Sequence, residues 1–236
     1  MLSCVEIGGS SIETVTFAED GTVVRVEGAH RADGAALAIA TPGIVADGRV
    51  VAASNLGWYD VDPAAALDLG APAAVVLNDA QAAALGELAL RQESDDIVYV
   101  SLGTGVGGAV IVGGELVADN LFGHAAGHSE MHCVCGRVGC VETVAAGWAL
   151  PSPLTDAALD AAANAVAVAI EREPLATPDL VVVGGGLARR YPQLVARIGD
   201  YVGPHRYVEA SAALRGFKSA AAWGLRAALA RDPQRA

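Results

Sequence analysis

Three of the four cysteines in this 236-residue chain lie close together in sequence, at Cys133, Cys135 and Cys140. Thiolate and imidazole groups favour zinc in a tetrahedral site, and a full set of four protein ligands leaves no open position for catalysis. In a chain without a secretory signal, such a cluster indicates a metal site rather than disulfide bonds. The sequence therefore predicts a structural zinc site.

Three nearby histidines could supply the fourth ligand of this site: His124, His128 and His132. His132 adjoins Cys133, and the side chains of neighbouring residues rarely converge on one ion. We take His128 as the fourth ligand, with Gly136 and Gly139 allowing the chain to turn between the cysteines.

Three glycine-rich turns follow apolar runs, at residues 8–11, 103–108 and 184–186. Glycine lets the backbone approach an anion closely and direct N–H groups at it, and the third turn opens a predicted helix, whose N-terminus favours phosphate. No turn contains the Gly-Lys-Ser/Thr of a Walker loop, and no single strand–turn–helix unit holds the G-x-G-x-x-G of a dinucleotide site. Each turn alone could be an ordinary connection, but together they indicate a nucleotide site of another layout.

Asn78 and Asp79 end a predicted buried strand and begin a predicted helix. Ligands bind at the carboxyl ends of strands in open α/β sheets, and a carboxylate there could take a proton from an attacking hydroxyl group. The alternative is that Asp79 only caps the helix, since aspartate is a preferred N-cap residue.

The elements that must position these residues form an α/β pattern. Apolar runs predict strands over residues 2–7, 12–17, 22–27, 36–43, 49–53, 72–79 and 180–186, and a strand, glycine turn and two further strands over 97–117. Predicted helices cover residues 63–69, 79–92, 140–150, 155–172, 188–202 and 217–231. The opening and residues 97–117 share one pattern, which suggests two related lobes, 1–95 and 96–236.

Composition excludes several classes of function. The formal net charge is −12 and the chain has a single lysine, Lys218, so we expect no nucleic-acid partner. No continuously apolar run reaches the roughly 18 residues of a membrane span, and the N-terminus lacks a basic segment before a long apolar stretch. We expect a cytoplasmic protein with no membrane partner.

Six stretches, in this order, resemble the ROK family of sugar kinases and sugar-responsive repressors. They are EIGGSSIE (6–13), TPGIVADGRVVAASNLGW (41–58), LNDAQAAALGE (77–87), SLGTGVGGAVIVGGELV (101–117), CVCGRVGCVETVAAG (133–147) and VVVGGG (181–186). The resemblance implies an actin/hexokinase-like (ribonuclease H-like) pair of α/β lobes with the active site in the cleft between them. It also implies ATP-dependent phosphorylation of a hexose or N-acetylhexosamine, with Mg²⁺, by a homodimer.

The resemblance assigns roles to individual residues. Asp79 matches the catalytic base, and the sugar-binding positions are Gly43, Asn55, Asn78 and Glu142. The first phosphate loop is Gly8, Gly9 and Ser10, and the second is Gly103, Thr104, Gly105 and Gly107. The adenosine lies against Gly184, Gly185 and Gly186. Zinc braces the sugar-binding loop.

The sequence also departs from the family pattern. Glu6 stands where the family usually has aspartate. Aligning Gly127-His128 on the family's Glu-x-Gly-His places Ala125 at the sugar-binding glutamate, whereas a shifted register places His128 there as a sugar ligand and makes His132 the zinc ligand.

Only residues 29–34 stand where the family has a helix, so the first lobe is shortened and we expect one sheet face to be less covered. The repressor branch carries an N-terminal DNA-binding domain, which is not expected here because the chain begins directly at the first strand. Two alternatives stay open: a catalytically degenerate sugar or nucleotide sensor, and polyphosphate as the phosphate donor.

Overall fold

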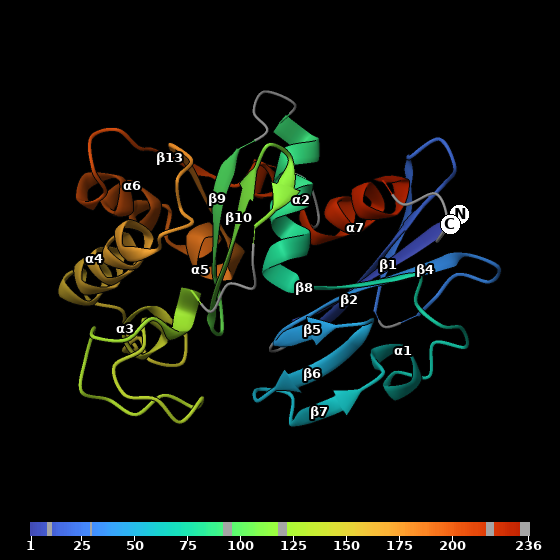
Figure 1. Ribbon diagram of the computed structural model, residues 1–236, viewed down its shortest axis with the longest axis horizontal. Helices are drawn as coiled ribbons and strands as arrows, with labels where there is room; N and C mark the ends of the chain where they lie inside the picture. Colours follow the sequence, from blue (N-terminus) through green and yellow to red (C-terminus); the bar gives the residue numbers. More distant parts are fainter. Residues whose placement is uncertain (9–10, 29, 92–95, 118–121, 216–219, 232–236) are drawn as a thin grey trace. The chain divides into compact units, whose positions relative to one another are not determined.

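The computed structural model describes the chain except residues 9–10, 29, 92–95, 118–121, 216–219 and 232–236 (Figure 1). The chain divides into two compact units, Met1–Arg91 with Phe217–Ala236, and Gln92–Gly216. The predicted boundary near residue 95 therefore lies close to the observed one. The predicted second lobe, 96–236, is corrected at its end, because the closing segment belongs to the first unit.

The first unit is built on a five-stranded sheet in the order β3-β2-β1-β4-β8. Its strands are β1 (Leu2–Ile7), β2 (Ile12–Phe17), β3 (Val23–Glu27), β4 (Ala36–Thr41) and β8 (Val75–Asn78). The first three form an antiparallel meander, whereas β1, β4 and β8 are parallel. The carboxyl ends of β1, β4 and β8 therefore meet at one edge of the sheet, next to predicted site residues of this unit.

Two helices of the first unit, α2 (Asp79–Arg91) and α7 (Ala220–Arg231), touch backbone to backbone. A Cβ added to Gly86 would lie 1.8 Å from the carbonyl oxygen of Ala220, and one added to Gly224 would lie 1.7 Å from that of Ala82. Two glycines facing each other's helix thus permit an approach that no larger residue allows. This contact holds the closing helix in the first unit.

Both faces of the central strands are covered. Consecutive residues of β1 and β4 are buried, which requires apolar partners on each side of the sheet. One side contacts α7, and the other packs against α1 (Pro63–Ala66) and the antiparallel sheet β5-β6-β7. The strands of that second sheet are β5 (Ile44–Ala46), β6 (Arg49–Ala53) and β7 (Trp58–Val61). The expectation of a less covered face is therefore wrong for these strands.

The second unit repeats this topology, with the strand order β11-β10-β9-β12-β13. Its strands are β9 (Ile97–Leu102), β10 (Val106–Val112), β11 (Glu115–Leu116), β12 (Leu180–Gly184) and β13 (Tyr207–Ala210). Again three antiparallel strands precede parallel ones, because β12 runs parallel to both β9 and β13. The matching strand orders confirm the internal repeat that the sequence pattern suggested.

The helices of the second unit are partly as predicted. They are α3 (Glu142–Ala145), α4 (Asp156–Arg172), α5 (Gly185–Arg190) and α6 (Pro192–Tyr201), with 3₁₀ turns η1 (Phe122–His124) and η2 (Ala212–Arg215). The helix predicted over 188–202 is two helices, because Pro192 lacks the N–H that a continuous helix would use and therefore starts a new one. Strand β13 was not predicted from the sequence.

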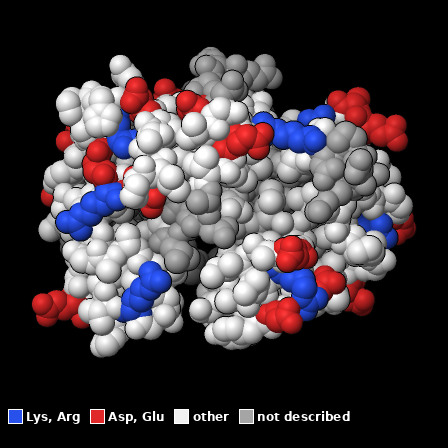
Figure 2. All heavy atoms as spheres, in the orientation of Figure 1, with Lys and Arg blue, Asp and Glu red and all other residues white. Residues whose placement is uncertain are grey.

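Charged side chains are scattered on both units. On the face drawn in Figure 2, the described basic side chains are interspersed with acidic ones and form no extended basic patch. Within the described part of the chain, no helix combines the length and apolarity needed to cross a membrane.

Candidate functional site

Asn78, at the end of β8, organises the start of helix α2. Its Oδ1 accepts the backbone N–H groups of Ala80 (3.0 Å) and Gln81 (3.3 Å), and its Nδ2 donates to the carbonyl of Gly43 (2.9 Å). Asn78 is therefore the N-cap of α2, and Asp79 is the first helical residue. The alternative that Asp79 serves only as the cap is wrong.

The Asp79 carboxyl lies at the edge where the parallel strands end. Its Oδ1 accepts the N–H of Ala80 at 2.9 Å. Burial raises the pKa of this carboxyl, and the hydrogen bonds from Ala80 and Asn78 lower it by less. A carboxylate whose pKa is raised toward neutrality is a stronger base than an exposed one, which suits proton abstraction.

Gly43 joins the other predicted sugar-binding residues to this edge. Its φ of +95° lies in the left-handed region, and a Cβ there would lie 2.2 Å from the carbonyl oxygen of Ala52. The end of β6 thus lies directly against Gly43, and exposed Asn55 follows two residues after Ala53. The structure therefore brings Gly43 and Asn78 together beside Asp79, and the sugar-binding roles of Gly43, Asn55 and Asn78 stay predictions.

The first glycine turn leaves the same sheet edge. The N–H of Gly8 donates to the carbonyl of Ser11 at 2.7 Å, directly after β1. Gly9 and Ser10 lie outside the described residues. Because β1 and β4 are parallel, Gly8 lies at the edge that carries Gly43.

In the second unit, the second and third glycine turns lie side by side. The N–H of Gly103 donates to the carbonyl of Gly105 at 3.0 Å, and Thr104 lies within that turn. A Cβ on Gly185, whose φ is +91°, would lie 2.3 Å from the carbonyl oxygen of Leu102. Gly185 is thus packed against the end of β9, where the second loop begins. Gly107 differs from expectation, because it pairs with Ser101 inside β10 rather than lying in the turn.

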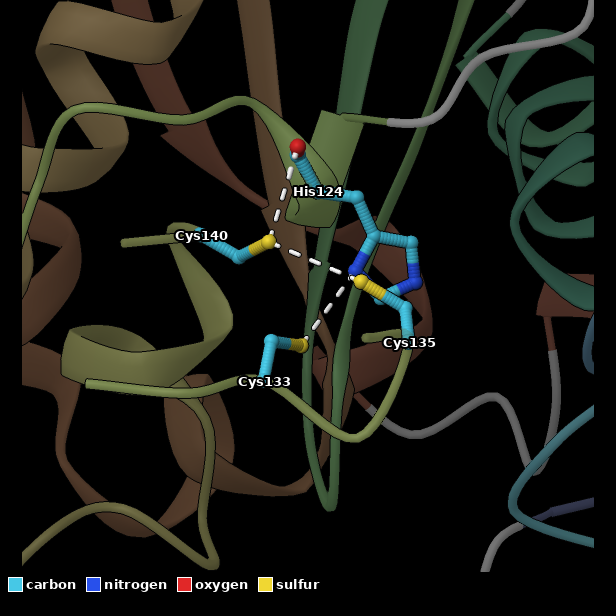
Figure 3. A group of neighbouring side chains, drawn as sticks. All are labelled: His124, Cys133, Cys135 and Cys140. Atoms are coloured by element: carbon cyan, nitrogen blue, oxygen red, sulfur yellow. Dashed lines mark hydrogen bonds between the residues drawn. The ribbon is translucent and has the colours of Figure 1, made fainter. Parts of the chain in front are cut away.

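A histidine and three cysteines form the predicted cluster (Figure 3). One ligand atom each from His124, Cys133, Cys135 and Cys140 lies within 4.8 Å of all the others. His124 Nδ1 is 3.6 Å from Cys133 Sγ, and the sulfurs of Cys135 and Cys140 are 3.7 Å apart. A tetrahedral site with Zn–S bonds of about 2.3 Å has ligands about 3.8 Å apart. The four residues therefore fit a structural zinc ion.

The histidine of the cluster is His124, so the prediction of His128 is corrected. The 3₁₀ turn η1 ends at His124 and presents its ring to the thiols. His128 donates its backbone N–H to Gly139, and its buried Nε2 has no partner among the described residues. Burial and the nearby Arg172 guanidinium lower the pKa of His128. His132 is not one of the four residues of the cluster.

The histidine assignment also corrects the alignment. The family's Glu-x-Gly-His pattern falls on residues 121–124, with Leu121 rather than Ala125 or His128 at the glutamate's position. Leu121 itself lies outside the described residues.

The loop that carries the thiols is held by its own backbone. Cys133 N–H donates to the carbonyl of Arg137 (2.8 Å), and Gly139, with a φ of +74°, lies against the carbonyl of Ser129. Burial, with smaller contributions from the neighbouring sulfurs of Cys135 and Cys133, raises the pKa of Cys140 to about 12. A divalent cation among these sulfurs would reverse that effect and hold them as thiolates.

Glu142 lies between the cluster and the second glycine turn. Its Oε1 accepts the N–H of Val106 at 2.8 Å. Its Oε2 is 3.8 Å from Cys133 Sγ and 3.9 Å from His124 Nδ1. Sequence reasoning missed this connection, although the spacing of Glu142 two residues after Cys140 placed it next to the cluster.

Comparisons with known proteins agree on one family. A model of the ROK family matches residues 26–195. N-acetylmannosamine kinase of Shigella boydii is 41% identical over 123 residues, 47% of this chain and 42% of the relative. The corresponding Salmonella paratyphi B kinase is 38% identical over 139 residues, 53% of this chain and 47% of the relative. These matches thus span about half of each protein.

Solved structures share the fold. A ROK glucokinase from Streptomyces griseus, in complex with glucose and AMPPNP, superposes with a TM-score of 0.77 and 23% identity, over 95% of this chain and 97% of that one. An inorganic polyphosphate/ATP-glucomannokinase from Arthrobacter superposes with a TM-score of 0.67 and 23% identity, over 98% of both chains. The actin/hexokinase-like α/β fold that the sequence predicted is confirmed.

Proposed function

The chain belongs to the ROK family, and from that premise we propose that it is an ATP-dependent kinase for a hydroxyl group of a hexose or N-acetylhexosamine. The observation that carries this proposal is that Asn78, and not Asp79, caps helix α2. Because Asn78 caps α2, the Asp79 carboxylate is placed at the carboxyl edge of the sheet without being required as the cap.

The chemistry needs little from the protein beyond positioning, a base and charge stabilisation. Asp79 takes the proton of the sugar hydroxyl as its oxygen attacks the γ-phosphorus of ATP, and ADP leaves. Gly43, Asn55 and Asn78 orient the sugar, while the backbone N–H groups of the glycine turns hold the phosphates. Mg²⁺ bound with ATP supplies neutralisation of the phosphate charge. A general base contributes roughly 10²–10⁴-fold to such a rate.

The metal cluster supports this site without taking part in the reaction. His124, Cys133, Cys135 and Cys140 would hold a zinc ion that fixes the loop carrying Glu142. Four protein ligands leave no position on the ion for a substrate.

The relatives named N-acetylmannosamine kinase support an N-acetylhexosamine as the acceptor, and the structural relatives named for glucose support a hexose. The test is a coupled assay of ADP release over both sugar classes, with ATP and polyphosphate as donors. The Asp79→Asn variant should bind sugar as the unmodified chain does and lose at least 100-fold in turnover. Equal turnover in both proteins would refute the role of Asp79.

A second candidate is a degenerate kinase that senses a sugar or a nucleotide. The leucine at position 121 favours it, because the family's sugar-binding glutamate is absent there. The loss of one charged hydrogen bond costs about 1.5–3 kcal/mol, which weakens sugar binding roughly ten- to a hundredfold. Sugar or nucleotide binding without turnover on any sugar, in the unmodified chain, would establish this second function.

A further inference from the structure

We propose that Glu142 is a positioning residue that locks the second phosphate loop, residues 103–106, onto the His124–cysteine cluster, so that nucleotide affinity depends on its side-chain oxygen. The inference rests on the proposed function, because it assigns a role within the nucleotide-binding half of that kinase. It differs from the sugar-binding role that the family resemblance implies for Glu142.

The first observation is the contact between the carboxylate and the loop. The buried N–H of Val106 donates to Oε1 at 2.8 Å. A Cβ on Gly105 would lie 2.4 Å from the same oxygen. The φ of Gly105 is not in the left-handed region, so its backbone conformation does not require glycine. A side chain at position 105 would therefore displace the Glu142 carboxylate from its present position.

The second observation is that the turn η1, which ends at the cluster residue His124, also contacts Val106. A Cβ on Gly123 would lie 2.0 Å from the carbonyl oxygen of Val106, and Gly123 directly precedes His124. Val106 is therefore fixed through its N–H by Glu142 and through its carbonyl side by the turn η1. Both contacts come from residues next to the cluster in sequence, because Gly123 directly precedes His124 and Glu142 follows Cys140 by two positions.

The third observation concerns the far end of the Glu142 side chain. Its Oε2 accepts a weak hydrogen bond from Cys133 Sγ, at 3.8 Å. The same oxygen lies 3.9 Å from His124 Nδ1, outside the 3.5 Å limit of an N–H···O bond. The carboxylate is thus packed beside the cluster while its strong hydrogen bond goes to the loop. Glu142 is also the first residue of α3, so its backbone is fixed by the end of the cysteine loop.

The loop can bind phosphate only if its N–H groups are held in place. A hydrogen bond to a charged acceptor is among the stronger ones, and removing the acceptor leaves the Val106 N–H buried without a partner. Glu142→Ala should therefore weaken nucleotide binding by about tenfold or more. Glu142→Gln keeps an oxygen at the same position, so nucleotide affinity should stay within about threefold of the unmodified chain.

The experiment is isothermal titration of Mg·AMPPNP into the unmodified chain and both Glu142 variants without sugar, followed by titration of N-acetylmannosamine and glucose. Glu115→Ala and Glu115→Gln are the matched controls, because Glu115 is an exposed glutamate in β11 of the same unit. Zinc content is measured for each protein.

The proposal predicts loss of nucleotide affinity in Glu142→Ala, its retention in Glu142→Gln, and unchanged zinc in both. It is overturned if both variants bind AMPPNP normally and lose only sugar affinity, or if Glu142→Ala loses zinc together with nucleotide. If the unmodified chain binds no nucleotide, the proposed function fails first, and that result is distinct from the variant pattern.

Discussion

Replacing Gly86 by alanine tests the packing of the closing helix on α2. The added Cβ would lie 1.8 Å from the Ala220 carbonyl oxygen, whereas real Cβ atoms essentially never come within 3.0 Å of another heavy atom. The helices would therefore have to separate by about 1.2 Å, the difference between those distances. Overpacking of a tight contact costs about 1–3 kcal/mol, and contacts across a widened gap lose dispersion energy.

Helix propensity acts in the opposite direction, because alanine is favoured over glycine by about 1 kcal/mol in a helix interior. Gly199→Ala in α6 is the matched control, since its Cβ would meet only ordinary contacts with Val208, at 3.5 Å or more. We expect Gly199→Ala to raise the free energy of unfolding by about 0.5–1 kcal/mol, and Gly86→Ala to lower it by about 2 kcal/mol or more.

Urea denaturation followed by tryptophan fluorescence measures this difference. Two of the three tryptophans, Trp58 and Trp223, lie in the first unit, so the signal reports mainly on the unit that contains Gly86. A Gly86→Ala variant as stable as the unmodified chain, or more stable, would refute the backbone contact between α2 and α7.

Three further predictions concern the metal cluster and the base. Metal analysis should find about one zinc per chain, with zinc content and melting temperature both reduced in Cys135→Ser; a stable protein with freely reactive thiols would contradict this. His124→Ala should lose zinc and His128→Ala should keep it; the opposite result would return the fourth ligand to His128. Because burial raises the pKa of Asp79, the charged carboxylate lowers the stability of the folded chain at any pH above the pKa of an unfolded aspartate. Asp79→Asn should therefore be more stable than the unmodified chain at pH 7 and lose that advantage in acid. Calorimetry at both pH values measures the difference, and equal stability at pH 7 would contradict the raised pKa.

The sequence predicted most strands, the internal repeat and the residues of each sheet edge. Apolar runs and glycine turns are local signals, and parallel strands place their ends at one edge whatever the loops between them do. That is why Gly43, Asn78 and Asp79 were correctly expected to lie together.

The predictions of the fourth metal ligand and of the place of the closing helix were wrong because contacts between residues distant in sequence determine both. His124 and His128 both precede the cysteines by a short stretch, and the 3₁₀ turn at residues 122–124 directs the His124 ring at the thiols. The return of α7 to the first unit depends on Gly86 and Gly224 facing each other, which no local pattern reveals.

The identity of the helix cap was also undecided by composition, because both Asn78 and Asp79 are good N-cap residues. The contact between Asn78 Nδ2 and the carbonyl of Gly43, 35 residues away, fixes Asn78 in the capping position.

The most direct test of the account is mass spectrometry of the sugar after incubation with Mg·ATP and either the unmodified chain or Asp79→Asn. The account predicts a sugar monophosphate, formed with equimolar ADP, from at least one hexose or N-acetylhexosamine with the unmodified chain, and a product at least 100-fold slower with the variant. The same rate of product formation in both would contradict it.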